Sequence, residues 1–94
     1  MTVIEHDEPA TVTLPNALDC EWAHQEREAL LNIVESTAAD DIALHCHEVE
    51  FIDSVGIGTL VSLHRRCRCL SKNLRIFGIK GQPLALVRQT SLAR

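Results

Sequence analysis

Asp53 and Ser54 stand directly before two closely spaced glycines, and they are the side chains whose types and spacing most readily suggest chemistry. A serine between a strand and a helix is typical of a hydrolase nucleophile. That motif requires Gly-x-Ser-x-Gly, however, and Ile52 occupies the position of its first glycine. After Ser54 the sequence contains one histidine, His64, and no carboxylate, so the ordered Asp and His partners are missing. We therefore do not expect an enzyme.

The glycines at positions 56 and 58 suggest close contact with another surface. Gly56-Ile57-Gly58 lacks the third glycine of a dinucleotide-binding loop, and no Gly-Lys-Ser/Thr follows as in a P-loop. Small residues at the start of a helix allow another surface to approach it closely. The pattern predicts a docking site and no nucleotide or other cofactor.

Phosphorylation is the modification that suits Ser54 best. Asp53 and Ser54 are both good helix N-caps, and either could satisfy the free amides of the first turn. A phosphate adds a charge of about −1.5 to −2, which the N-terminus of a helix tolerates. Beside Asp53 it would create a negative cluster that repels a docked partner. We expect Ser54 to be a switch on an interface.

Metal binding is not expected from the histidines or cysteines. His45 and His47 would lie on one face of a strand, but no third ligand at suitable spacing completes a site. The four cysteines form no paired Cys-x-x-Cys pattern and should stay reduced in the core or occur incidentally: Cys20, Cys46, Cys67 and Cys69.

Length and composition predict one small α/β domain spanning residues 1–94. The chain is 46% hydrophobic with 3% aromatic residues, so aliphatic side chains must form most of its core. No apolar run reaches the roughly 20 residues that span a bilayer, and residues 1–8 do not resemble a signal peptide. We expect a cytoplasmic protein without membrane insertion.

Charge is divided unevenly along the chain. Residues 1–50 carry twelve acidic side chains and one basic one, whereas residues 51–94 carry one acidic and eight basic side chains. The overall pI of about 5.6, the scarcity of aromatics and the absence of a binding motif argue against direct nucleic-acid binding. The asymmetry is a hint of a protein partner.

The periodicity predicts strands that alternate with helices. Two short antiparallel strands come first, then a break in which Asn16 tolerates the left-handed conformation, with Asp19 as the N-cap of the first helix. Apolar positions with periods of two and 3.6 define the remaining elements. The predicted strands are residues 2–5, 10–14, 42–47 and 74–77, and the predicted helices are residues 21–34, 55–70 and 84–89.

With these elements in place, a motif can be compared with a known family. The segment Val49-x-Phe51-Ile52-Asp53-Ser54-Val55-Gly56-Ile57-Gly58-x-Leu60, followed by a helix and a Leu-x-Ile-Phe-Gly strand, resembles the STAS domain of bacterial anti-sigma factor antagonists. The resemblance covers about residues 10–92. It implies a single STAS-like α/β domain with a four-stranded, mainly parallel or mixed sheet, two longer helices and a short C-terminal helix.

The resemblance also implies a function as a phosphoprotein that regulates transcription by partner switching. An anti-sigma factor that is also a kinase, using ATP and Mg²⁺, would phosphorylate Ser54, and a protein phosphatase would reverse the modification. The unphosphorylated form would bind the anti-sigma factor and release the sigma factor. The residues expected to face the partner are Asp19, Asp53, Ser54, Val55, Gly56, Ile57 and Gly58.

Several positions depart from the family pattern. Asn16 replaces a glycine, His45 stands where a strand aspartate is frequent, and Ser91 replaces a glycine in a turn. The chain ends at Arg94, where many relatives continue, so the sheet could lack one strand and leave an edge uncovered. The alternative resemblance is to the stand-alone STAS subunit of ABC-type lipid transport systems, which would dock without being an enzyme.

Overall fold

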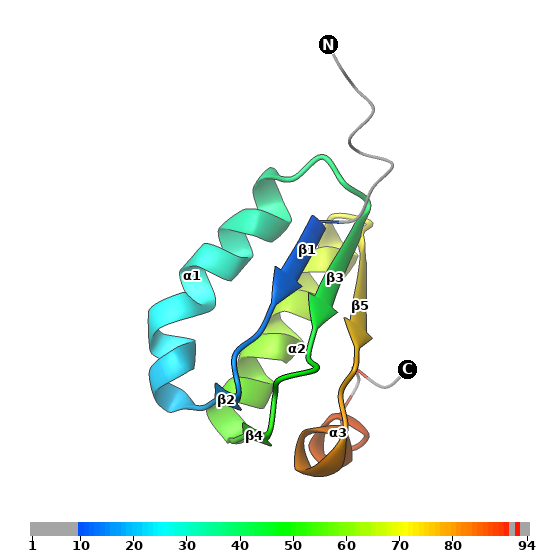
Figure 1. Cartoon of the computed structure of the whole chain (residues 1–94). Helices are drawn as coiled ribbons and strands as arrows, with labels where there is room; N and C mark the ends of the chain where they lie inside the picture. Colours follow the sequence, from blue (N-terminus) through cyan, green and yellow to red (C-terminus); the bar gives the residue numbers. More distant parts are fainter. Residues whose placement is uncertain (1–9, 91, 93–94) are drawn as a thin grey trace.

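Short strands alternate with helices along the whole described part of the chain, which comprises residues 10–90 and residue 92 of a computed structural model (Figure 1). In chain order the elements are β1 (Ala10–Thr13), β2 (Ala17–Leu18), α1 (Cys20–Ser36), β3 (Asp41–His45), β4 (Phe51–Ile52), α2 (Ser54–Cys69), β5 (Asn73–Phe77) and α3 (Gly81–Val87). The predicted strand at residues 2–5, and with it the predicted antiparallel pair, lies outside the described residues.

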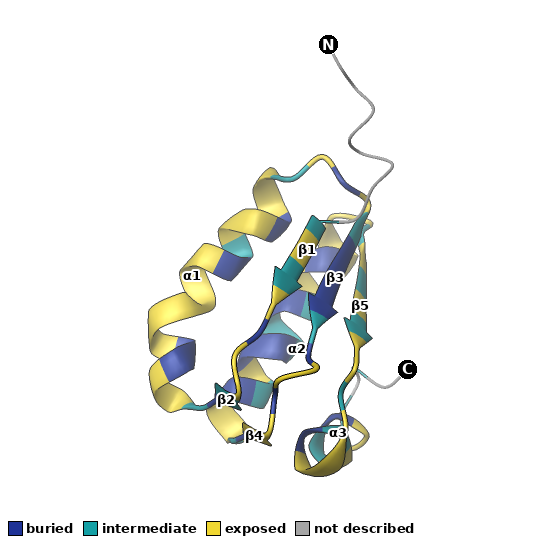
Figure 2. Ribbon diagram, viewed as in Figure 1, coloured by how far each residue is buried: buried dark blue, intermediate teal, exposed yellow. Residues whose placement is uncertain are grey.

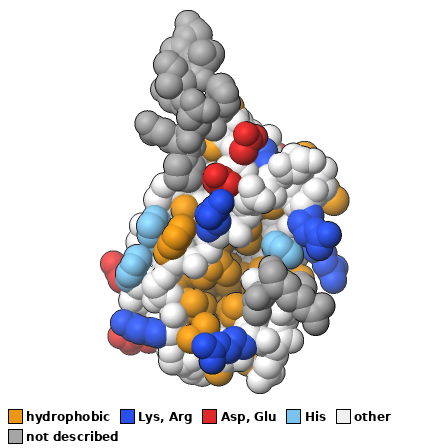
Figure 3. Space-filling view, turned by 90° about the vertical axis from the view of Figure 1, so that its right-hand side faces the viewer, with side chains coloured by type: hydrophobic (Ala, Val, Ile, Leu, Met, Phe, Trp, Pro, Cys, Tyr) orange, Lys and Arg blue, Asp and Glu red, His pale blue; other side chains and the backbone are white. Residues whose placement is uncertain are grey.

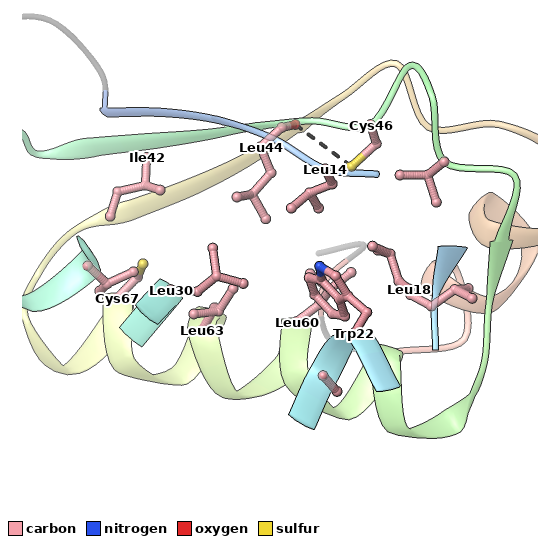
Figure 4. Packing of buried hydrophobic residues seen from close by; sticks show 14 residues of the cluster. Leu14, Leu18, Trp22, Leu30, Ile42, Leu44, Cys46, Leu60, Leu63 and Cys67 are labelled. Carbon is pink, nitrogen blue, oxygen red and sulfur yellow. Dashed lines mark hydrogen bonds between the residues drawn. The ribbon is translucent and has the colours of Figure 1, made fainter. Parts of the chain in front are cut away.

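The main sheet has three parallel strands in the order β1-β3-β5. Ile42 of β3 aligns with Ala10 on one side and Leu74 on the other. Parallel neighbours need a crossover connection, and here α1 and α2 supply the two crossovers. Both helices cover the same face of the sheet (Figures 1 and 4). The carboxyl ends of the strands therefore point toward the N-terminal ends of both helices.

A second, very short pair of parallel strands extends from this carboxyl end. Ala17 and Leu18 of β2 align with Phe51 and Ile52 of β4. The predicted α/β architecture with mainly parallel strands is confirmed, but the predicted four-stranded sheet is replaced, within the described residues, by a three-stranded sheet and this separate pair. Two-residue strands show no alternation, so periodicity does not reveal them.

The core fills the space between the sheet and the two helices. Figure 4 shows Ile42 and Leu44 of the sheet directed toward Leu60 and Leu63 of α2, with Trp22 of α1 beside them. The four aliphatic side chains are each at most 1% exposed. Burying such a side chain contributes about 1.5–3 kcal/mol. Figure 2 shows that the buried positions of both helices form one inward stripe, while the outer faces are exposed.

The predicted helices are present with shifted ends. α1 continues two residues beyond the predicted Val34, and α3 begins at Gly81, three residues before its predicted start. Lys72 explains the extension of α1, because its ammonium group donates hydrogen bonds of 2.7 Å to the carbonyls of Val34 and Thr37. Carbonyls in the last turn of a helix otherwise lack partners. A cap from a residue so far along the chain leaves no local signal.

Asn16 does not adopt the left-handed conformation that its residue type suggested. Among the described residues other than glycine, the positive φ angle belongs to Ser71, at 59°. Asn16 instead presents its carbonyl to the amides of Glu50 and Phe51, at 2.7 and 3.1 Å. The glycine that is usual at this position in the family is therefore not needed for backbone freedom here.

Among the described helices, none is long and apolar enough to cross a membrane.

Candidate partner-binding site

Asp53 joins the N-termini of both long helices. It is the N-cap of α2, with φ −106° and ψ −175°, and one carboxylate oxygen accepts a hydrogen bond of 2.8 Å from the amide of Gly56. The other oxygen accepts one of 3.0 Å from the amide of Cys20, the first residue of α1. Each bond satisfies a backbone donor that has no partner within its helix. Of the two candidate caps, Asp53 therefore takes the role and Ser54 is left free of it.

Asp19 is the N-cap of α1, as its position in the sequence predicted. Its carboxylate accepts a hydrogen bond of 2.9 Å from the amide of Trp22. The side chain is half-buried and also lines a hollow of about 490 Å³ between β1 and α1. Asp19 and Asp53 thus lie at adjacent helix starts, and both carboxylates are held by backbone amides.

Ser54 is exposed at the first position of α2. Asp53 already satisfies the amides of Gly56, through its carboxylate, and Ile57, through its backbone carbonyl at 2.9 Å. The Ser54 hydroxyl therefore stands at the positive end of a 16-residue helix. The neighbouring Asp53 already caps this helix, so the hydroxyl is not needed as a cap. This hydroxyl is thus accessible from solvent without unfolding of any described element.

Two exposed apolar side chains flank Ser54. Val55, in the first turn of α2, is 46% exposed, and Phe51 of β4 is 48% exposed. Large apolar side chains left in water beside a polar group are typical of interface anchors. Val55 was predicted to face the partner, whereas Phe51 was not. The signal was available, since Phe51 lies on the opposite side of β4 from the buried Ile52.

Gly56 differs from the expectation that a partner approaches it. It is buried, and a Cβ atom at this position would overlap the carbonyl oxygen of Leu18. The surface that approaches Gly56 closely is thus β2 of the same chain. This contact lets the start of α2 lie against the β2–β4 pair, so the glycine serves the fold.

Ile57 and Gly58 lie in different surroundings. Ile57 is half-buried and packs against the main core. Gly58 is exposed, and a Cβ atom placed on it would meet nothing within 4 Å outside its own helix. Gly58 lines a groove of about 390 Å³ between α1 and α2. Of the two glycines, it is Gly58 whose missing side chain leaves open surface.

Gln82 is a positioning residue that the sequence reasoning missed. Its side-chain amide donates a hydrogen bond of 2.8 Å to the carbonyl of Ile52, and its side-chain oxygen accepts one of 3.0 Å from the Ile52 amide. The side chain thus pairs with β4 as a neighbouring strand would. Because Ile52 directly precedes Asp53 and Ser54, the start of α3 holds the strand that carries the site.

His45 and His47 are stacked near the carboxyl end of β3. Their ring centroids are 5.6 Å apart, and the ring of Phe77 also stacks with that of His45, at 5.4 Å. No group of three or more metal-ligating side chains occurs among the described residues. His45, which stands where the resemblance leads one to expect an aspartate, is half-buried and belongs to this stack of rings.

The cysteines divide into two buried and two exposed. Cys46 and Cys67 are buried, and Cys20 and Cys69 are exposed. Burial raises the pKa of the Cys46 thiol to about 11. Burial also raises the pKa of Cys67, although the nearby Lys72 acts in the opposite direction. The buried pair therefore behaves as small protonated core residues.

Comparison with known proteins gives one family and one fold. The family model of the STAS domain matches residues 1–94. The structure is similar to that of the unphosphorylated anti-sigma factor antagonist SpoIIAA, with a TM-score of 0.72 and 17% identity over 96% of this chain and 79% of the other. It is also similar to the Bacillus cell fate determinant SpoIIAA in its phosphorylated form, with a TM-score of 0.75 and 15% identity over 98% and 82% of the two chains.

A protein of a transporter family provides a third structural match. A sulfate transporter family protein from Wolinella succinogenes has a TM-score of 0.73 and 16% identity, over 88% of this chain and 66% of the other. At these identities the matches establish the shared fold. Similar folds thus occur both in proteins called anti-sigma factor antagonists and in a protein of a transporter family.

Proposed function

We propose, because the chain belongs to the STAS domain family, that it is an anti-sigma factor antagonist that phosphorylation of Ser54 switches off. The unphosphorylated form binds an anti-sigma factor that is also a serine kinase, and this releases the sigma factor. A protein phosphatase restores the binding form. The chain itself acts as a cytoplasmic binding protein, and ATP and Mg²⁺ belong to the kinase.

The exposed Ser54 hydroxyl next to the fully engaged Asp53 is the observation that carries the proposal. A phosphate at a helix N-terminus changes fold stability by about 1 kcal/mol or less and in the favourable direction. Like charges brought together in an interface instead cost several kcal/mol. The second effect is larger, so phosphorylation would abolish docking and leave the domain folded.

The exposed apolar residues support the same reading. Phe51 and Val55 are close to Ser54 in the sequence and both are about half exposed, so a partner seated on this apolar surface would also contact the region of the hydroxyl. A phosphate, with three strongly hydrated oxygens, would have to be desolvated in that contact. Structural similarity to SpoIIAA in both its unphosphorylated and phosphorylated forms is consistent with a fold that accommodates either state.

Phosphate transfer in vitro tests the modification. The purified chain is incubated with ATP, Mg²⁺ and each anti-sigma-type serine kinase encoded in the same genome, and the products are analysed by intact mass and peptide mapping. We expect one added phosphate on Ser54 and none on Ser54→Ala. A phosphate mapped to another residue, or equal labelling of Ser54→Ala, would contradict the assignment.

The structural match to a sulfate transporter family protein favours a second candidate function. In that function the chain would dock on a transport complex, as would a STAS subunit of an ABC-type lipid transporter. Affinity purification from the native host distinguishes the two. Recovery of an ATP-binding kinase favours the regulator, whereas recovery of an ABC ATPase or permease favours the transport subunit.

A further inference from the structure

Gly58 has no role in the described fold that would require a glycine. Within a helix, glycine is about 0.8–1 kcal/mol less favourable than alanine. At position 56 the fold nevertheless requires glycine, because a Cβ atom there would overlap the carbonyl oxygen of Leu18. At Gly58 an added Cβ would point into open space. The chain thus accepts a local loss of stability that no contact among the described residues explains.

The open space at Gly58 belongs to a groove with an apolar floor. Ala23 of α1 and Thr59 of α2 are each 3% exposed and lie between the two helices. The Thr59 hydroxyl donates to the carbonyl of Val55 at 3.1 Å, so it turns its polar atom toward its own helix. Val55 and Gly58 border this floor on the α2 side. The groove therefore offers a hollow into which a large apolar side chain fits.

Cations lie along the same groove. Arg27 of α1 borders it and reaches the hydroxyl of Ser62 only at 3.5 Å. The hollow continues past Arg27 toward Arg65. Arg66, by contrast, is paired with Glu35 at 3.2 Å. No acidic side chain is among the described residues that line these two hollows. Arg27 makes no ion pair with the described residues, so its guanidinium group is available to a carboxylate on the partner.

The groove is continuous with the switch. Ser54 and Gly58 are four residues apart in α2, so they lie one turn apart on the same face of the helix, and Ser62 follows one turn later. Val55 both flanks Ser54 and lines the groove. A phosphate on Ser54 would therefore stand at the mouth of the groove, on the face along which the partner lies.

We propose that the groove between α1 and α2 receives one large apolar side chain of the partner, seated over Gly58, from a segment whose neighbouring carboxylate pairs with Arg27. The inference rests on the proposed function, since the occupant is a segment of the anti-sigma factor that Ser54 regulates. It adds the mode of recognition. A phosphate on Ser54 would stand on the helix face along which this segment lies, and its strongly hydrated oxygens would hinder seating of the segment, which couples modification to release.

Substitutions that fill the groove test this mode. Gly58→Phe places a ring in the hollow, and Gly58→Ala adds only a methyl group. Arg27→Glu reverses the charge at the border. Arg68→Leu, at an exposed position of α2 that lines neither hollow, is the matched control. Circular dichroism and thermal unfolding verify that each variant is folded.

Binding is measured by calorimetric titration with the purified kinase that phosphorylates Ser54. We expect Gly58→Phe and Arg27→Glu each to weaken binding about tenfold or more, a loss of about 1.4 kcal/mol, while Arg68→Leu binds like the wild type. If Gly58→Phe binds as tightly as the wild type, the groove is not the docking site. The proposed function survives that result, provided that phosphorylation of Ser54 still weakens binding.

A second probe keeps the two ideas separable if no kinase is found. A synthetic amphipathic helical peptide with leucine and glutamate spaced four residues apart is titrated into ¹⁵N-labelled protein. We expect amide shifts concentrated at Ala23, Gly58, Thr59 and Ser62, and their loss in Gly58→Phe. Shifts that avoid these amides, or that persist in Gly58→Phe, would overturn the groove proposal independently of Ser54.

Discussion

Asp53 caps two helices with the two oxygens of one carboxylate, whereas Asp19 caps one. Removing a side-chain N-cap costs about 0.5–2 kcal/mol, typically 1. We therefore predict that Asp53→Ala lowers the free energy of unfolding by about 2 kcal/mol and Asp19→Ala by about 1 kcal/mol. Urea denaturation measures both. Equal losses in the two variants would show that Asp53 does not stabilise both helix starts.

The two glycines of the motif should respond in opposite ways to the same substitution. Gly56→Ala drives a methyl group into the Leu18 carbonyl. We expect this overpacking to lower the free energy of unfolding by about 1–3 kcal/mol. Gly58→Ala meets no obstacle and should raise the free energy of unfolding by up to about 1 kcal/mol through helix propensity. Thermal unfolding of both variants measures the contrast. A destabilised Gly58→Ala would contradict the open surface at that position.

Cys46 should make stability depend on pH in the alkaline range. Its pKa is raised from 9.0 to about 11 in the folded chain, so the unfolded chain loses the thiol proton first. Stability from the buried thiol is complete below pH 9 and falls as the pH rises toward 11. Urea denaturation across this range should show the decline, and Cys46→Ala should make it shallower. An unchanged decline would assign the effect to other groups.

At the scale of elements, β4 depends on a side chain 30 residues away. Gln82 makes two hydrogen bonds to the backbone of Ile52, each contributing about 1 kcal/mol. We predict that Gln82→Ala, which removes both bonds, speeds hydrogen exchange of the Ile52 amide by about thirtyfold. Gln89→Ala is the control, because it also removes a glutamine side chain, but one that is exposed and lies beyond the end of α3. If both variants exchange alike, Gln82 does not hold β4.

Periodicity explains which elements were predictable from the sequence. The long helices show apolar stripes that bury Leu30 in α1 and Leu63 in α2, and the central strand buries Ile42 and Leu44. These patterns placed α1, α2 and β3 within a few residues of their observed ends. The pair β2–β4 was missed because two residues cannot display a period. The pair joins segments more than 30 residues apart, with Leu18 aligned to Ile52, and such a contact is visible only in the folded chain.

The candidate site was predictable to a similar extent. Asp53 and Ser54 could be placed at a strand-to-helix junction from residue type alone, since carboxylates and hydroxyls prefer N-caps. The sequence did not reveal that Asp53 also reaches the amide of Cys20 in another helix. Nor could it separate the inward role of Gly56 from the open surface at Gly58. Each distinction depends on contacts between segments distant along the chain.

At the scale of the whole molecule, the charge asymmetry of the sequence becomes a spatial one. Acidic side chains are frequent on α1, whereas the end of α2 carries Arg65, Arg66 and Arg68. Figure 3, which views the side of the molecule where β5 and α3 lie, shows hydrophobic side chains in a hollow with Lys and Arg side chains around it. Within the described residues, β5 is an edge of the three-stranded sheet. This side lies apart from the α1–α2 groove proposed for the partner.

Binding of the kinase-type anti-sigma factor to defined states of Ser54 tests the central claim most directly. Calorimetric titration compares the unphosphorylated chain, the chain phosphorylated on Ser54, Ser54→Ala and Ser54→Asp. We predict that the unphosphorylated chain and Ser54→Ala bind alike, and that Ser54→Asp and the phosphorylated chain bind at least about tenfold more weakly because negative charge enters the interface. Equal affinity of all four forms for the same partner would contradict the account.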